Sequence, residues 1–318
     1  MKTFLKFFAC VIILTITSCK KKESTPSNTA TTTTTTITYS STNNFFVQNG
    51  VSMQTYNVNG TTGGSFTSPQ GTVVTIPANA FVTQTNVPIT GNVIIQFKDI
   101  YKKSDMLLSN IPTMMVYGSP LKSGGEFYMK AIYNSAAVVL STGKKITVAQ
   151  PIALTGVLDT AMKAFVQQKD TTGGVSYVWT ATDSLKYFAS NYVFSLYQFN
   201  YPLDSGSWCN SDNPSYFSSY TQTTLTLQPN DNITTYGTYV FLVFKNLNSM
   251  IHVYDNGTNF PYYFAPQGLQ CTLVAVGAKN GNLYSSFVPI TISANQTVSF
   301  SMSQTTTNAF ITQLKTLN

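Results

Sequence analysis

The chain has 318 residues, of which 43% are hydrophobic and only 9% are charged, and its formal net charge is +7. All cations are lysines, and five of the eighteen lie in the first 22 residues, so the remainder of the chain is nearly neutral. Because nucleic-acid recognition relies on a basic face that usually includes arginine, this composition argues against a nucleic-acid partner. The length allows one large domain or two of ordinary size.

The N-terminus carries an export signal. Lys2 and Lys6 precede an apolar run that is too short to span a bilayer, which needs about 20 residues. The run ends at Ile16-Thr17-Ser18-Cys19, which resembles a bacterial lipobox. The resemblance implies that residues 1–18 are removed and that Cys19 receives lipid; the alternative is an ordinary signal peptide with a chance cysteine.

Three acyl chains on Cys19 would anchor the protein firmly without a transmembrane helix. By resemblance to the sorting rules of such lipoproteins, Lys20 favours the outer membrane, and Lys20 to Glu23 partly matches the surface-export pattern of Bacteroidetes. The face of the membrane, periplasmic or cell-surface, stays open. The Thr- and Ser-rich residues 19–44 have little to bury, so we expect a disordered tether.

From residue 45 onward, short β-branched runs alternate with Gly, Pro and Asn, which predicts a mainly β protein. The clearest strand is Asn92 to Ile100, with Val93, Ile95 and Phe97 on one face. Glycine pairs and prolines, such as Gly124-Gly125, read as turns between further strands. We therefore expect a β-sandwich domain over residues 45–155.

The stretches VTIPANAF, GNVIIQFKDIYKKSDMLLSNIPT and SGGEFYMKA resemble a β-sandwich module of Bacteroidetes lipoproteins. That module is itself similar to the ZU-five domain of ankyrins and netrin receptors. The resemblance covers about residues 66–151 and implies a fold without a known ligand. Some relatives cleave themselves at a His-Phe-Ser sequence, but the one histidine here, His252, is followed by Val253, so autoproteolysis is not implied.

Residues 156–220 are expected to form a β-rich connector, with a hairpin turn at 170–174. Residues 221–318 are expected to form a second β-sandwich-like domain. Its strongest local signal is Asn280-Gly281 between two apolar runs, which predicts a tight hairpin. Phe310, Ile311, Leu314 and Leu317 lie at helical spacing and predict a short C-terminal helix.

The ionisable residues offer little for catalysis. His252 lies in an apolar strand without a recognisable nucleophile motif, so a structural histidine is the better interpretation. Glu23 and Glu126 are the only glutamates, and Asp99 and Asp105 flank a lysine pair in what reads as a solvated loop. We therefore predict no enzymatic activity and no cofactor.

The sequence also contains few side chains that could bind a metal ion. One histidine and two cysteines beyond Cys19 are too few for structural zinc. Calcium remains an alternative at Asp204, Asn210, Asp212 and Asn213, although such clusters usually make turns. Cys209 and Cys271 could form a disulfide in an oxidising envelope, or each could be a small buried hydrophobe.

Three aromatic residues are candidate ligand contacts, namely Trp208, Tyr262 and Tyr263. Flat rings can stack on sugar faces, but the alternative for the run from Phe260 to Phe264 is a strand whose rings fill a core. The sequence predicts a non-catalytic envelope lipoprotein that binds glycan or protein. The alternative is a structural or assembly component of an outer-membrane complex.

Overall fold

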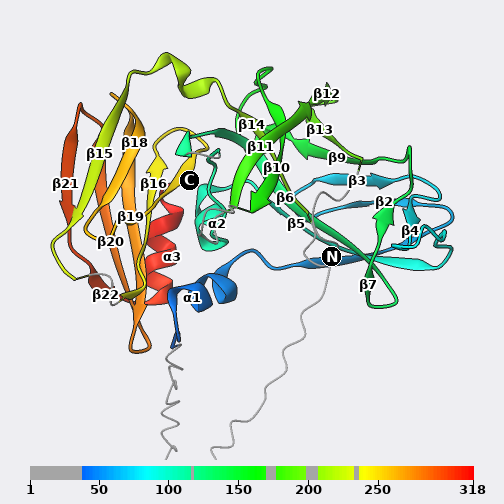
Figure 1. The fold of residues 1–318 in the computed structure, drawn as a ribbon, viewed down its shortest axis with the longest axis horizontal. Coiled ribbons are helices and arrows are strands. Elements are labelled where there is room, and N and C mark those ends of the chain that lie inside the picture. Colours follow the sequence, from blue (N-terminus) through cyan, green and yellow to red (C-terminus); the bar gives the residue numbers. More distant parts are fainter. Residues whose placement is uncertain (1–37, 116–117, 170–176, 198–206, 233–235) are drawn as a thin grey trace, which may run out of the picture. The chain divides into compact units, whose positions relative to one another are not determined.

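We describe the protein from a computed structural model, in which residues 38–115, 118–169, 177–197, 207–232 and 236–318 are placed. This part of the chain is mainly β, as predicted, with a few short helices (Figure 1). None of its helices is long and apolar enough to cross a membrane. The predicted signal peptide, Cys19, the turn at 170–174 and Asp204 lie outside the described residues.

The first sandwich is built from two sheets that share one hydrophobic core. One sheet has the order β1-β5-β6-β14-β10-β11, with β7 paired to β6, and the other has the order β12-β13-β9-β3-β2. A small third pair is formed by β4 and β8. The strand bounds are β1 Gln54–Asn59, β2 Gly64–Thr67, β3 Val73–Ile76, β4 Phe81–Val82, β5 Asn92–Ile100, β6 Lys122–Tyr133, β7 Ala136–Ala137, β8 Val139–Leu140, β9 Ile146–Pro151, β10 Lys163–Lys169, β11 Tyr177–Ser184, β12 Lys186–Phe188, β13 Asn191–Leu196 and β14 Ser207–Asn213.

Strand β5 shows how the sequence pattern makes this core. Val93, Ile95 and Phe97 point inward and are completely buried, while Ile94 between them is exposed. Phe97 packs against Phe127 of the neighbouring strand β6, and Phe127 meets Phe194 of the opposite sheet edge-on at 5.2 Å. The period of two therefore places one apolar row of each strand between the sheets.

The second sandwich also consists of two sheets, β18-β15-β21 and β17-β16-β19-β20-β22. All pairs are antiparallel except β15 with β21, which is parallel. The strand bounds are β15 Gln222–Pro229, β16 Tyr239–Phe244, β17 Met250–Val253, β18 Phe260–Pro266, β19 Gln270–Lys279, β20 Asn282–Thr291, β21 Gln296–Phe300 and β22 Ser303–Thr305. The predicted hairpin is confirmed, because Asn280 and Gly281 join β19 to β20 and both have positive φ.

Strands β16 and β19 are apolar on both faces, and the structure explains why. Leu242 and Leu273 point into the core between the two sheets, whereas Phe241 and Val274 point to the other side. That side is covered by three short helices, α1 Thr42–Asn49, α2 Lys103–Leu108 and α3 Thr307–Lys315 (Figure 1). A strand buried on both faces reads as a continuous apolar run rather than an alternating one.

The helical layer combines the two ends of the described chain. Phe45 of α1 meets Phe310 of α3 edge-on at 5.5 Å, and Phe46 meets Tyr239 of β16 at 5.0 Å. The C-terminal helix is confirmed and is capped by Thr306, whose side chain accepts a hydrogen bond from the backbone N–H of Ala309. The described part of the chain therefore begins on the second sandwich, forms the first sandwich and returns to the second.

Helix α1 changes where the fold begins. The tether was expected to reach residue 44, but the ring of Tyr39 is buried, and its backbone N–H donates to the carbonyl oxygen of Gly281 at 3.3 Å. Ser41 caps α1 through its hydroxyl, which accepts from the N–H of Asn44. Residues 38–44 are thus part of the folded body, because their aromatic and capping groups find partners in distant segments.

The segment 156–220, expected to be a connector, supplies strands to both sheets of the first sandwich. Strands β10, β11 and β14 extend the sheet of β5 and β6, and β12 and β13 extend the sheet of β9. It is β-rich, as expected, but its core residues Phe194 and Cys209 belong to the same cluster as Phe97 and Phe127. The first sandwich therefore includes strands up to Asn213.

Candidate binding groove

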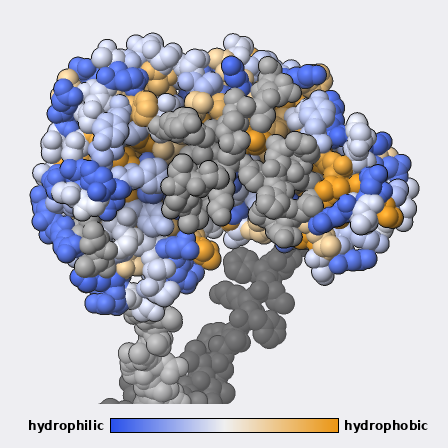
Figure 2. Space-filling view, in the orientation of Figure 1, coloured by the Kyte–Doolittle hydropathy of each residue, from blue (hydrophilic) through white to orange (hydrophobic). Residues whose placement is uncertain are grey.

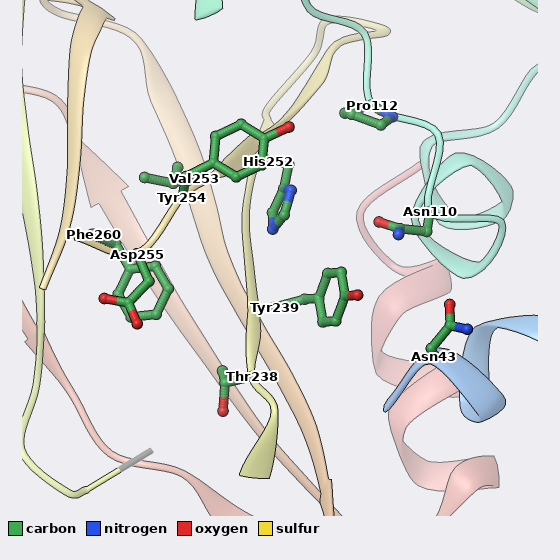
Figure 3. Close-up of a pocket in the computed structure, with 10 residues that line it drawn as sticks. All are labelled: Asn43, Asn110, Pro112, Thr238, Tyr239, His252, Val253, Tyr254, Asp255 and Phe260. Atoms are coloured by element: carbon green, nitrogen blue, oxygen red, sulfur yellow. The ribbon is translucent and has the colours of Figure 1, made fainter. Parts of the chain in front are cut away.

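A groove lies along the edge strand β17 of the second sandwich, at the border of the helical layer (Figure 3). Its volume is about 660 Å³. Segments far apart in the sequence form its walls: α1, the loop after α2, β16, β17 and the start of β18. We call it the β17 groove, and it is lined by Asn43, Asn110, Pro112, Thr238, Tyr239, His252, Val253, Tyr254, Asp255 and Phe260.

Three of the lining rings form a continuous series. His252 is stacked on Tyr239 of the neighbouring strand, with 5.3 Å between ring centroids and 16° between planes. Tyr254 meets His252 edge-on at 4.4 Å. Strand pairing places them, since β16 and β17 are antiparallel neighbours and Phe241 lies directly opposite His252. Tyr254 is 39% exposed, so one end of the series is open to solvent.

His252 is neutral in this setting. Burial among the neighbouring rings lowers its pKa to about 4, since the charged imidazolium loses hydration there. The ring is nevertheless partly exposed, and its remaining hydration favours the charged form, which reduces the lowering of the pKa. Within the described contacts, neither ring nitrogen has a hydrogen-bond partner. A neutral imidazole offers one N–H donor and one nitrogen acceptor, so it can bind a hydroxyl group in either direction.

The opposite wall of the groove is polar. Asn43 of α1 and Asn110 after α2 line this wall, across the groove from the three rings (Figure 3). In the described chain neither side-chain amide makes a hydrogen bond. Asn110 has a φ of +53°, a left-handed conformation that asparagine tolerates at the end of a helix. Among the described residues of the lining, Asp255 is the only charged one, and its Oδ1 accepts from the N–H of Gly257 at 2.7 Å.

The groove has the groups for binding but not an assembled catalytic set. Figure 3 shows Asp255 beside Phe260, turned away from His252. Burial lowers the pKa of His252, and no carboxylate raises it. A general base needs an orienting partner and a nucleophile within hydrogen-bond reach. The described residues around His252 instead present ring faces, amides and one exposed carboxylate.

The aromatic residues singled out from the sequence lie elsewhere. Tyr262 of β18 is only 4% exposed and donates its hydroxyl to the carbonyl oxygen of Gly118 at 3.2 Å, so it is a core residue. Tyr263, its neighbour, is 64% exposed. Trp208 of β14 is half-buried in the first sandwich, where it packs edge-on against Tyr128. The three do not lie in the β17 groove.

Cys209 and Cys271 are both free and buried. Cys209 lies in the core of the first sandwich and Cys271 in the core of the second. Burial raises the pKa of both thiols, that of Cys271 to about 12. The two residues are therefore separate small hydrophobes in the structure, and the disulfide that the sequence allowed is not formed.

The acidic residues interpreted as solvated charges are placed differently from expectation. Asp99 is completely buried at the end of β5, where its Oδ2 accepts hydrogen bonds from the hydroxyls of Ser68 and Thr72. The expectation of a solvated loop was wrong for Asp99, and Asp105 lies on helix α2. Glu126, which had no obvious partner in sequence, is also completely buried.

A strand bulge makes room for this buried polar chemistry. Gly125 lies inside β6 rather than in a turn, with a φ of +116°. A Cβ atom there would lie 2.4 Å from the ring of Tyr101 and 3.1 Å from the Gln150 side chain. Glycine is therefore required both by the backbone conformation and by the close approach of Tyr101.

Sequence reasoning missed Asn43, Asn110, Tyr239 and Tyr254 as groove residues. Two of them depend on helices α1 and α2, which are too short to produce a clear periodic signal. The Met250–Tyr254 run, in which His252 and Tyr254 alternate with apolar side chains, was the one local signal for a ring series beside His252. No protein family, curated protein or solved structure matches the chain.

Proposed function

We propose that the protein is a non-catalytic, lipid-anchored outer-membrane lipoprotein whose folded part binds a glycan in the β17 groove. The observation that carries the proposal is the series of contacting rings formed by Tyr239, His252 and Tyr254 opposite two unengaged asparagine amides. Sugars present apolar C–H faces and a ring of hydroxyls. An aromatic series next to neutral donors and acceptors meets both needs.

The charge of the groove supports a neutral ligand over an anionic one. Asp255 is the only charged residue in the described part of the lining, and His252 is neutral because of its lowered pKa. A strongly anionic glycan would lack a cation to pair with in this lining. The proposed ligand class is therefore a neutral oligosaccharide.

A glycan array probed with the purified full-length chain in detergent tests the proposal. We expect binding to one group of neutral oligosaccharides, and binding that is weaker by about tenfold in the Tyr254→Ala variant. Undiminished binding in Tyr254→Ala would place the ligand outside the groove, and no binding to any glycan would contradict the proposal.

The anchor is proposed from the Ile16-Thr17-Ser18-Cys19 sequence alone. We expect metabolic labelling with a fatty acid to modify the chain, and the Cys19→Ser variant to lose the label. Protease treatment of intact cells then separates the two membrane faces. Degradation of the body indicates surface display, and survival indicates the periplasmic side.

A second candidate function, docking in an envelope complex, is favoured by one apolar surface. Val157 and Phe188 at the β9 and β12 end of the first sandwich are 83% and 76% exposed, and they border a hollow of about 470 Å³ with Leu158. Figure 2 shows hydrophobic residues at the surface of this sandwich. Crosslinking in intact cells tests it, with Phe188→Ser expected to lose the crosslinked partner while glycan binding persists.

A further inference from the structure

Two buried carboxyl groups lie close together on β6 and β14, the two central strands of one sheet of the first sandwich. Glu126 of β6 and Asp212 of β14 are both completely inaccessible to solvent. Strand pairing sets Asn210 opposite Glu126 and Asp212 opposite Ser123. The side chain of Asn210 donates to Oε1 of Glu126 at 3.4 Å, and the carboxyl of Asp212 interacts electrostatically with Glu126. The pair therefore shares one small, closed environment.

Most of the oxygens in this pair lack a partner. In the described structure, Oε2 of Glu126 and both side-chain oxygens of Asp212 are buried without a hydrogen bond. Ser123 and Asn210 lie near enough to Asp212 to favour its charged form. The Ser123 hydroxyl, however, donates its hydrogen bond to Oδ1 of Asn210 at 2.9 Å. The nearby lysine, Lys122, pairs with Asp159 instead.

Burial of carboxyl oxygens without hydrogen-bond partners lowers the stability of the protein on its own. Burial, and for Glu126 the nearby Asp212, raises the pKa of both carboxyl groups well above the usual values. A neutral carboxyl would still need an acceptor for its O–H, and an ionised one would need donors or a cation. The three oxygens are therefore able to accept a cation, which would neutralise the two carboxylates.

We propose that Glu126 and Asp212 hold one calcium ion. Two carboxylates balance its charge, and calcium takes oxygen ligands in flexible geometry. Water would complete the ligand set, because the amide oxygen of Asn210 already accepts from Ser123 and its NH2 group faces Glu126. In the described chain no three His, Cys, Asp or Glu side chains gather at one place, so the site depends on these two carboxylates and neutral oxygens.

The position of the site gives the ion a structural role. Ser123, adjacent to the pair, donates its backbone N–H to the carbonyl oxygen of Asn248 at 2.7 Å, and the Asn248 amide donates back to the Ser123 carbonyl oxygen at 3.0 Å. Asn248 belongs to the β16–β17 turn of the second sandwich. The calcium ion therefore stabilises the strand ends that hold the two sandwiches together.

Calcium alone, added to the full-length chain after treatment with EDTA, is the probe. We expect one equivalent to bind in isothermal titration calorimetry, and the midpoint of thermal unfolding to rise by several degrees. Glu126→Gln and Asp212→Asn should each abolish both effects, because each removes one of the two charges. Asp105→Asn, which removes a carboxylate on helix α2, is the matched control and should respond like the wild type.

Failure of the wild-type chain to bind calcium would overturn the proposal, and the pair would then hold a shared proton. Unchanged calcium binding in both site variants would overturn it as well. If a variant does not fold, elemental analysis of the purified wild-type chain still decides, since one calcium per chain is expected before EDTA treatment and none would contradict the site. Glycan binding is read separately, so it can fail without affecting this test.

Discussion

The ammonium group of Lys103 donates a hydrogen bond to the backbone carbonyl oxygen of Phe244 over 2.7 Å. Lys103 begins helix α2 of the segment between β5 and β6, and Phe244 ends β16 of the second sandwich. The side chain is almost completely buried. A lysine is thus used as an internal tie between two parts of the chain that are 141 residues apart.

Removal of the hydrogen bond from Lys103 to Phe244 should destabilise the fold. Lys103→Met keeps the apolar stem but removes the charged hydrogen bond, and we expect a loss of about 1 to 3 kcal/mol in the free energy of unfolding. Burial lowers the pKa of Lys103 to about 8, below its usual value of about 10.4 in the unfolded chain. Between these values the unfolded chain binds more protons, so the stability contributed by Lys103 rises with pH.

Urea unfolding at pH 7 and pH 9.5 measures both effects of the Lys103 variant. The gap in stability between the wild type and Lys103→Met should widen at the higher pH. A gap that is equal at both values would show that Lys103 does not titrate in this window.

The bulge glycine of β6 should not tolerate a side chain. Gly125→Ala places a Cβ atom 2.4 Å from the Tyr101 ring at a φ of +116°, so we expect a loss of about 3 kcal/mol or more. Gly143→Ala is the matched control. Its φ is also positive, at +76°, but nothing lies within 4 Å, so its loss should be about 1 kcal/mol. Chemical denaturation of both variants separates steric from backbone strain, and equal losses would remove the steric argument.

In calcium-free buffer, Glu126 should make stability depend on pH. Its folded pKa is raised above the unfolded value of about 4.3, so its contribution is fully favourable below that value and is lost as pH rises toward the folded pKa. Glu126→Gln removes this loss. We expect the variant to be more stable than the wild type at pH 7, with the gap closing near pH 4. A constant gap across this range would contradict the buried position of a titrating Glu126.

The β17 groove can be compared directly with an exposed tyrosine elsewhere on the same sandwich. Tyr254→Ala should weaken binding of the array-identified glycan by about tenfold, since a ring contact contributes up to about 1.5 kcal/mol. Tyr263→Ala removes a more exposed ring outside the groove and should leave affinity unchanged. Titration calorimetry of the two variants decides, and a larger effect of Tyr263→Ala would move the site to β18.

Glycan affinity should be nearly independent of pH between 8 and 5. An unperturbed histidine would become charged near pH 6.5, but the pKa of His252 is lowered to about 4, so its ring stays neutral throughout. Affinity should then fall as pH drops through about 4, when the imidazolium loses its acceptor. A midpoint near 6.5 in the binding profile would show that His252 is more hydrated than its ring contacts indicate.

Local patterns predicted much of the fold. The nine residues of β5 and the Asn280-Gly281 turn were recognised because alternation and turn chemistry act within a few residues. Helix α2 was missed because six residues cannot show a helical period, and its N-terminal residue, Lys103, finds its partner only in the folded chain. The β-sandwich fold class was therefore accessible from sequence, and the helical layer was not.

The candidate site was much less predictable. Asn43, Asn110 and His252 come from an N-terminal helix, a loop between strands and an edge strand, and they lie together only after the helical layer packs. The surroundings of Glu126 could not be predicted either, because Asn210 and Asp212 approach it through strand pairing across more than 80 residues. Tyr262 appeared as a ligand contact because its sequence does not reveal which face of β18 is buried.

The bridge from Tyr39 to Gly281 determines how the body would carry mechanical load. Tyr39 also bonds through its hydroxyl to Thr307 at the start of α3. Tension applied at the beginning of the described chain therefore enters the β19–β20 hairpin and the C-terminal helix directly.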